Sequence, residues 1–433
     1  MINGSRLIVL VILEFWDVPF MFCVQVVSLL NFKKSSIRPV FSFLLMIGFM
    51  TSLAGCSTVG RLHPAPAKAS YHKAHISGFK RIRSWGDELP PFIESVIEER
   101  RRKLRINPAL ARRNDVLALS GGGADGAYGA GFLKGWSERG DRPEFTLVTG
   151  VSTGALIAPF AYLGPEYDET LRRFYTETKT SQILSIEPLA ALFGGAALGD
   201  PAPLIKTIKK EVDGALLRAI AREHRRGRLL LIGTTNLDAQ RQMIWNIGEI
   251  AASGHPFAAD LIRKILLASA SIPGVFPPVA FDVVIDGKRY QELHVDGGVT
   301  HEIFAYPASI KVKAIERRLG IRPKKTFWLL RNTKIAAEYK SVKLGVTDIA
   351  ERSISTLIKY QGRGDLIGLE RLARRDGFAF RLTSVPETFQ EKPKEIFDPE
   401  YMKKLYVVGY KAGLSGHAWR HRLGDQFTLK PRL

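Results

Sequence analysis

A sharp turn between a strand pattern and a helix pattern constrains the fold of this chain more than any other feature. The β-rich run that begins at Phe145 ends at Gly150, and an Ala-, Leu- and Ile-rich helical pattern follows Gly154. Residues 150–154 read G-x-S-x-G, and small residues around the serine let a strand turn abruptly into a helix. The sequence therefore predicts a nucleophile elbow that lifts Ser152 clear of a sheet.

Strand patterns alternate with helical patterns along most of the chain. Strands are predicted at residues 116–119, 145–149, 229–234, 283–285, 326–330 and 378–382. Helices are predicted at residues 127–139, 155–162, 167–178, 203–226, 257–269 and 342–374. Asp398 followed by Pro399 predicts the start of one more helix. Such alternation indicates an α/β fold with a mainly parallel central sheet covered by helices.

The N-terminal region has the pattern of a secretory signal. Basic residues between Lys33 and Arg38 precede an apolar run over residues 39–52, and Leu-Ala-Gly-Cys follows, ending at Cys56. The run has about 14 residues, and a spanning helix needs roughly 20, which favours a signal over a retained membrane anchor. The ending resembles the lipobox of bacterial lipoproteins. That resemblance implies a lipid on Cys56 and, with Ser57 next, an outer membrane location facing the periplasm.

Residues 1–32 precede a signal that is complete without them. They hold two apolar runs, residues 7–13 and 18–30, and we interpret them as a stretch ahead of the true start that takes no part in the fold. Cys23 and Cys56 are the only cysteines in the sequence. We therefore expect neither disulfides nor a cysteine metal site.

The chain is strongly basic, with a net charge of +21. Without residues 1–55 it would hold 59 Lys and Arg against 40 Asp and Glu, or +19, which favours anionic surfaces such as phospholipid headgroups. Basic clusters near Arg100 and Arg222 could also contact nucleic acid, but neither zinc-finger spacing nor an RNA-binding aromatic motif accompanies them. Solvated helix faces explain such clusters more often, so we expect no nucleic-acid partner.

Glycines cluster directly after the first predicted strand, within DVLALSGGGADGAYGAG at residues 115–131. Their spacing fits the G-x-G-x-x-G of dinucleotide-binding sites, and it fits a run of backbone N–H groups around an oxyanion equally well. A dinucleotide site needs an acidic residue at the end of the second strand, but here that strand ends in G-x-S-x-G. We therefore interpret Gly121, Gly122 and Gly123 as an oxyanion loop.

A serine nucleophile needs a base, and HVDGGVT supplies a candidate. Asp296 directly precedes Gly297 and Gly298 at the end of a β-like stretch, where a tight turn can aim a carboxylate, although a lone Asp-Gly turn is more often structural. The rival is a Ser-Asp-His triad, whose histidine would come from His294, His301, His417 or His421. His417 and His421 fit the chain order best but lie in a basic tail without a strand-end turn. We therefore predict that Asp296 takes the serine proton directly, with a pKa modestly raised by burial.

Together and in this order, the three motifs resemble the patatin-like phospholipase family. LASASIPGVFPPV, at residues 267–279, is also similar to the segment that precedes the aspartate in that family, and the resemblance covers about residues 115–300. It implies a three-layer α/β fold, a catalytic dyad of Ser152 and Asp296, and an oxyanion hole built from residues 121–123. Gly150 and Gly154 would flank the elbow.

The resemblance also implies an activity. It is that of a serine acyl hydrolase that cleaves carboxylic ester bonds of membrane phospholipids or lysophospholipids, with no metal and no cofactor. The lipid anchor would hold such an enzyme at the membrane surface. A catalytically inactive lipid-binding or scaffold lipoprotein on the same fold is the alternative.

The sequence also supports an expectation for one residue, Asp125, and one for the segment at residues 189–203. Asp125 stands where the family often has Arg or Lys, and a carboxylate near an oxyanion hole opposes catalysis, so we expect its side chain to point away and cap the helix through the N–H of Ala127 or Tyr128. Residues 189–203 are rich in Gly and apolar side chains. We interpret them as a buried loop plus strand, with a lipid-touching flap as the alternative.

These observations divide the chain into five parts. Residues 1–55 form the signal region and residues 56–80 a Pro-, Ala- and Ser-rich tether. Residues 81–114 form an N-terminal helical extension, residues 115–385 the patatin-like catalytic domain, and residues 386–433 a C-terminal helical segment and tail.

Overall fold

The computed structural model describes residues 61–186, 197 and 199–424 of the chain. The chain divides into two units, Met1–Thr58 and Val59–Leu433, and every described residue belongs to the second. Among these residues no helix has both the length and the apolar character needed to cross a bilayer. Cys56, the predicted signal and most of residues 189–203, predicted as a buried loop plus strand, lie outside the described residues.

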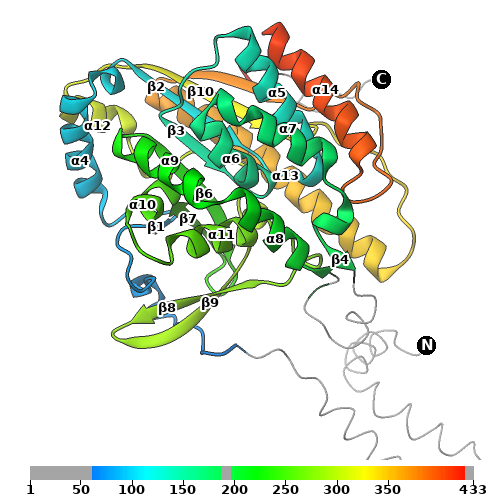
Figure 1. Ribbon diagram of the computed structural model, residues 1–433, viewed down its shortest axis with the longest axis horizontal. Coiled ribbons are helices and arrows are strands. Elements are labelled where there is room, and N and C mark those ends of the chain that lie inside the picture. Colours follow the sequence, from blue (N-terminus) through cyan, green and yellow to red (C-terminus); the bar gives the residue numbers. More distant parts are fainter. Residues whose placement is uncertain (1–60, 187–196, 198, 425–433) are drawn as a thin grey trace, which may run out of the picture. The chain divides into compact units, whose positions relative to one another are not determined.

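A nine-stranded sheet forms the centre of the second unit (Figure 1). Five strands pair in parallel: β2 (Arg113–Leu119), β3 (Leu147–Gly150), β6 (Leu229–Asn236), β10 (Lys324–Arg331) and β11 (Ala379–Ser384). Four others pair antiparallel: β1 (Arg83–Trp85), β7 (Arg241–Asn246), β8 (Val279–Ile285) and β9 (Lys288–Asp296). The predicted α/β fold with a mixed, mostly parallel sheet is confirmed.

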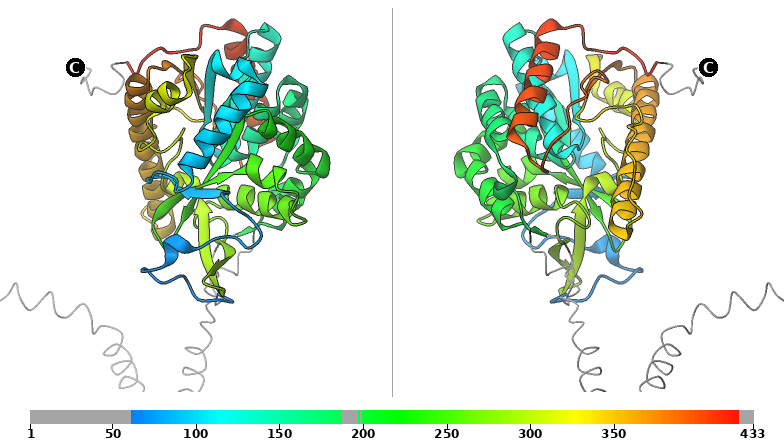
Figure 2. Two further views of the ribbon diagram at one scale, coloured as in Figure 1. Left: turned by 90° about the vertical axis from the view of Figure 1, so that its left-hand side faces the viewer. Right: turned by 90° about the vertical axis from the view of Figure 1, so that its right-hand side faces the viewer.

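Helices cover both faces of this sheet, as Figure 2 shows from two sides. Alternation along β2 sends Leu117 and Leu119 into one core and Val116 and Ala118 into the other. The first core is closed by α5 (Gly126–Arg139), α6 (Thr153–Leu163), α7 (Asp168–Glu177), α11 (Ala258–Ser269) and α14 (Pro399–Ser415). The second is closed mainly by α12 (Val312–Leu319) and α13 (Val346–Asp376). The result is three layers, helix on sheet on helix.

The observed elements differ from the predicted ones in two places. The single helix predicted over residues 203–226 is two helices, α8 (Ala202–Glu211) and α9 (Gly214–Arg225), because the Asp213 side chain accepts the N–H of Leu216 and starts a new helix. The antiparallel strands β1 and β7 were not predicted. Strand β1 has only three residues, Arg-Ser-Trp, which give no run of alternating apolar residues.

Residues 61–80, in the predicted tether, lie against the hairpin of β8 and β9. His75 and Val284 exchange backbone hydrogen bonds of 3.2 and 2.9 Å, and Gln291 donates its N–H to the Pro64 carbonyl. Arg61 contacts Asp238 at 2.5 Å. This part of the tether is therefore held to the fold. Beyond it, β1 contributes an edge strand of the sheet from within the predicted helical extension.

Candidate active site

The turn between β3 and α6 carries Ser152. The serine has φ of +54°, a conformation that residues with a side chain rarely adopt, and it is 6% exposed. A Cβ on Gly150 would lie 2.3 Å from the carbonyl oxygen of Gly154, and one on Gly154 would lie 2.4 Å from that of Leu119. Glycine is therefore required at both flanks, because the backbones touch there. The strand-turn-helix geometry of an elbow is present at this point.

Ser269, at the end of α11, holds this turn in place. Its hydroxyl accepts the N–H of Ser152 at 3.0 Å and donates to the carbonyl of Gly233 on β6 at 2.7 Å. Ser269 is fully buried and lies within the LASASIPGVFPPV segment, which gives that segment a role in fixing the turn. No pattern in the sequence indicated this role for Ser269.

Asp296 reaches the same place from β9. Strand β6 pairs with β3 through residues 229–232 and with β9 through residues 234–236, so β9 continues along the edge of β6 where β3 ends. Gly150 pairs with Ile232 and Asp296 pairs with Thr234, two residues further along β6. The shared neighbour thus brings the end of β9 beside the elbow.

The carboxylate of Asp296 is buried and only partly satisfied. Its Oδ1 accepts the N–H of Gly298 at 2.7 Å, while its Oδ2 is buried and accepts no hydrogen bond of ordinary geometry. Burial raises the pKa of Asp296 to about 7, with Glu302 raising it further and the nearby Ser152 hydroxyl and the Gly298 N–H lowering it. An unsatisfied oxygen on a weakly acidic carboxylate is suited to accept a proton near neutral pH.

The glycine loop passes directly beside Ser152. A Cβ on Gly121 would lie 3.2 Å from the Ser152 Cβ, which shows how close the two backbones come. The Gly121 N–H donates to the backbone carbonyl of Glu302 at 3.1 Å and is therefore not free for an oxyanion. The N–H groups of Gly122 and Gly123 donate no hydrogen bond to any described residue. Two of the three predicted donors are thus available.

Asn332, just after β10, fixes the shape of this loop. Its side-chain amide donates to the Ser120 carbonyl at 2.8 Å, and its backbone N–H donates to the Ser120 hydroxyl at 2.9 Å. Gly122 has φ of +150°, and a Cβ there would lie 2.9 Å from that of Asn332. Gly123 has φ of +56°, and the space where its Cβ would point is empty. The loop therefore opens toward space at Gly123.

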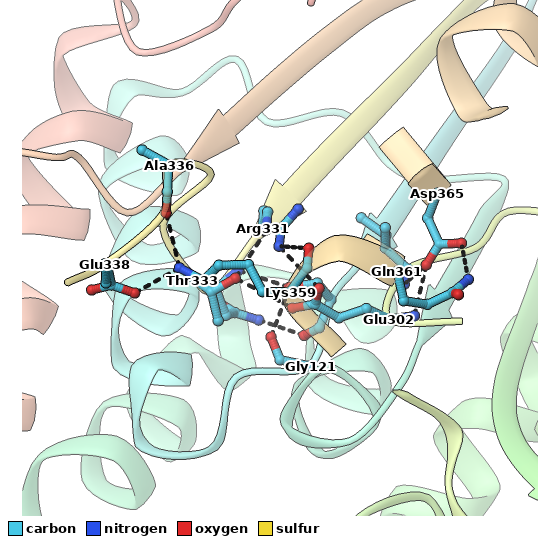
Figure 3. Close-up of polar contacts among 12 residues, drawn as sticks. Gly121, Glu302, Arg331, Thr333, Ala336, Glu338, Lys359, Gln361 and Asp365 are labelled. Atoms are coloured by element: carbon cyan, nitrogen blue, oxygen red, sulfur yellow. Dashed lines mark hydrogen bonds and ion pairs between the residues drawn. The ribbon is translucent and has the colours of Figure 1, made fainter. Parts of the chain in front are cut away.

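A buried ion pair lies behind the loop (Figure 3). Glu302 and Arg331 are 3% and 1% exposed, and their Oε2 and guanidinium nitrogen are 3.0 Å apart. Thr333 donates its hydroxyl to Glu302 Oε1 at 3.2 Å and accepts from Arg331 Nε at 2.9 Å. Burial raises the pKa of Glu302, against the opposing effect of Arg331. This pair anchors the residue whose carbonyl holds Gly121.

Asp365, in the middle of α13, secures the segment that follows Asp296. Its Oδ2 accepts the backbone N–H of Glu302 at 2.8 Å, and its Oδ1 contacts His301 Nδ1 at 2.8 Å and accepts from the Gln361 amide at 3.1 Å. Figure 3 shows Asp365 and Gln361 on α13, facing Glu302. No local pattern in the sequence links Asp365 to Glu302, because the two residues are 63 positions apart.

Asp125 does not cap α5 as we expected. It makes no side-chain capping hydrogen bond, and its Oδ1 instead accepts the hydroxyl of Tyr401 on α14 at 2.6 Å. Asp125 closes a 3-10 turn with helical φ and ψ, whereas a capping side chain usually comes from an extended residue. Burial raises the pKa of Asp125 to about 6, and the Tyr401 hydrogen bond lowers it. The carboxylate is thus engaged by Tyr401 of α14.

No hydrogen bond joins any of the four rival histidines to Ser152 or Asp296 in the described residues. His294 is buried, and its ring contacts the Thr234 hydroxyl at 2.9 Å and Glu292 at 3.2 Å. His301 is occupied by Asp365. His417 and His421 are exposed after the end of α14. These are the histidines that a Ser-Asp-His triad would need.

Comparisons with known proteins give one family match and several solved structures at low identity. Residues 117–308 match the model of a family described as patatin-like phospholipase. VipD of Legionella pneumophila is similar at 14% identity and a TM-score of 0.34, over 72% of this chain and 68% of that one. Human GIVD cytosolic phospholipase A2 (10%, TM-score 0.28) and ExoU, in its complex with SpcU from the type III secretion system of Pseudomonas aeruginosa (16%, TM-score 0.25), also align over 72% of this chain.

This chain spans about half, 53%, of each of the latter two proteins. No curated protein matches the sequence. The three motifs that the sequence analysis identified all lie within residues 117–308, the part of the chain that matches the patatin-like phospholipase model.

Proposed function

We propose that the protein is a serine acyl hydrolase that cleaves carboxylic ester bonds of membrane phospholipids or lysophospholipids. One observation carries the proposal: a buried serine on a strained strand-to-helix turn meets a carboxylate with an unsatisfied oxygen and two free backbone N–H groups. The family match over residues 117–308 supports the class of substrate. The same elements without turnover would make a lipid-binding scaffold, and the fluorophosphonate experiment below distinguishes the two.

The proposed reaction proceeds in two steps. Asp296 takes the proton from Ser152 as the serine oxygen forms a bond to the ester carbonyl carbon, and the N–H groups of Gly122 and Gly123 hold the developing oxyanion. Collapse of this intermediate breaks the ester bond, and the departing alcohol takes the proton from Asp296. Water, deprotonated by Asp296, then releases the fatty acid and restores Ser152. The mechanism requires no metal and no cofactor.

We also propose that the protein is a lipoprotein, anchored through Cys56 in the outer membrane and facing the periplasm. The Leu-Ala-Gly-Cys ending after a short apolar run supports this. Cys56→Ser should abolish labelling by a fatty acid analogue in cells and leave an uncleaved precursor, while Cys23→Ser should change neither. Equal labelling of the Cys56 variant and the wild type would refute the anchor.

The nucleophile is tested with a fluorophosphonate probe, which forms a covalent bond to activated serines. We expect the wild type to be labelled and Ser152→Ala to be unlabelled, because Ser152 has a base and an oxyanion loop beside it. Ser137→Ala, a half-buried serine on α5 whose hydroxyl donates to a helix carbonyl, is the control and should be labelled normally. Equally weak labelling of the wild type and Ser152→Ala would refute the hydrolase and favour the lipid-binding scaffold.

The base is tested by the pH dependence of hydrolysis. Asp296 must be ionised to take a proton, and its pKa is raised to about 7, so kcat/KM for a water-soluble ester should fall tenfold for each pH unit below that value. Asp296→Asn should lose roughly 10⁴-fold in kcat. Asp286→Asn, in the exposed β8–β9 turn, is the matched control, and His301→Ala should keep most of the activity. A histidine variant as inactive as Ser152→Ala would replace the dyad by a triad.

The oxyanion loop is tested at Gly123, where a methyl group meets no protein atom within 4 Å. Gly123→Ala should lower kcat by roughly 10²–10³, the effect of losing one oxyanion donor in other hydrolases, because the loop must leave φ of +56° or place a methyl in the open space. Gly140→Ala provides the control, since Gly140 also has positive φ, +87°, and open space, but lies at the far end of α5. Comparable activity of the two variants would contradict the assignment.

A further inference from the structure

Large apolar side chains are exposed together over residues 339–360. This segment contributes eight of the eighteen exposed large apolar side chains in the described residues: Tyr339, Val342, Leu344, Val346, Ile349, Ile354, Leu357 and Tyr360. Leu344 is 99% exposed, Tyr339 94% and Val346 86%. Isolated exposed apolar residues are ordinary, but a concentration of this kind marks an interaction surface. We call residues 339–360 the apolar surface.

Within it, the first half of α13 is amphipathic with its apolar side turned outward. Val346, Ile349, Leu357 and Tyr360 follow the three- and four-residue spacing of one helix face, and all four are exposed. A surface helix normally turns such a face to the core. Figures 1 and 2 show α13 running along the outer side of its layer.

The polar side of the same helix half contacts the protein instead. Lys359 donates to the carbonyl of Ala336 at 3.0 Å and pairs with the Glu338 carboxylate at 2.7 Å (Figure 3). Arg352 donates to the backbone carbonyl of Glu338 at 2.5 Å. Polar contacts to the segment that precedes α13 therefore set the rotation of the helix and hold its apolar face toward solvent.

Basic residues accompany this surface. Residues 339–360 contain four Lys and Arg against two Asp and Glu, a net charge of +2, and Lys340 lies 3.6 Å from the carboxylate of Glu351. Lys340 and Lys343 are exposed beside Leu344, where the segment enters α13. Exposed apolar side chains with lysines beside them are the composition of helices that lie in the interface of anionic bilayers.

We propose that the apolar surface of residues 339–360 docks on anionic phospholipid bilayers. Apolar side chains would enter the boundary between headgroups and acyl chains, and Lys340 and Lys343 would meet the lipid phosphates. The surface lies outside residues 117–308, so the family match does not account for it. A protein partner is the competing occupant, and the lysines beside the apolar side chains favour the anionic bilayer.

The surface is connected to the active site through α13. Tyr360, the last residue of the surface, precedes Gly362 by two positions, and a Cβ on Gly362 would overlap the Glu302 carboxylate, at 1.7 Å from Oε2. One turn further, Asp365 holds the backbone of Glu302, whose carbonyl binds Gly121. Docking of the apolar surface would thus bring the site around Ser152 to its lipid substrate. This consequence, unlike the docking itself, rests on the proposed hydrolase function.

The test reads the environment of α13 directly. In the full-length chain with Cys23→Ser, Cys56→Ser and Ser152→Ala, the added substitution Leu357→Cys is labelled with an NBD fluorophore and mixed with phosphatidylcholine vesicles that contain one third phosphatidylglycerol. We expect a blue shift and an intensity rise of about twofold or more, because the label enters the interface. Ile106→Cys, 84% exposed on α4 (Ile93–Ile106), is the matched control and should show neither change. The readout needs no turnover, so it stands whether or not the protein is a hydrolase.

Substitution of the lysines tests the charge. Lys340→Gln and Lys343→Gln should each weaken the response to these vesicles by about fivefold in lipid concentration. An unchanged Leu357 label in anionic vesicles would overturn the proposal, as would an equal response to vesicles of phosphatidylcholine alone. A shift that occurs without lipid and grows with protein concentration would assign the surface to contacts between protein chains instead.

Discussion

Contact between bare backbones at the elbow is the constraint on which the rest of the site depends. Gly154 packs against the carbonyls at the end of β2, and Gly150 packs against Gly154, each closer than any side chain would allow. This contact holds the carboxyl ends of β2 and β3 together. Because the glycine loop continues directly from β2, the same contact brings Gly121 beside Ser152. Ser152 then has no alternative to its strained φ, and its hydroxyl stays next to the loop.

The sequence predicted the parts of this arrangement that are encoded locally. Glycine spacing, the strand before Ser152 and the helix after it are all written within short segments, so the elbow and the loop could be placed on strands and helices without coordinates. The helix predicted over residues 203–226 is an exception. It is divided in two at Asp213, whose side chain caps a new helix, and hydrophobic periodicity does not reveal such a cap. Roles at the site remain predictions that the proposed experiments address.

Supporting residues could not be predicted, because their partners are distant in sequence. Glu302, Arg331 and Asp365 are ordinary charged residues in the sequence, yet they form one buried network that holds the loop and the segment after Asp296. Asp125 shows the reverse case. Its position at a helix start predicted a cap, but its carboxylate instead accepts a hydrogen bond from Tyr401 of α14, 276 positions away. Burial of charged groups is stable only when each finds such partners, and those partners are chosen by the tertiary structure.

Strand β6 pairs with both strands that carry the site, β3 before Ser152 and β9 before Gly297. The elbow and the end of β9 are each registered against it, at Ile232 and Thr234, although Ser152 and Asp296 are separated by most of the domain. Their spacing is thus set by hydrogen-bond register and is independent of how much chain lies between them. Loops and helices between α6 and β6 can lengthen or shorten without moving the two groups apart, whereas the segment between β7 and β8 carries Ser269, which holds the elbow. The fold thereby separates the part of the chain that fixes the chemistry from the part that is free to change the shape of the substrate's surroundings.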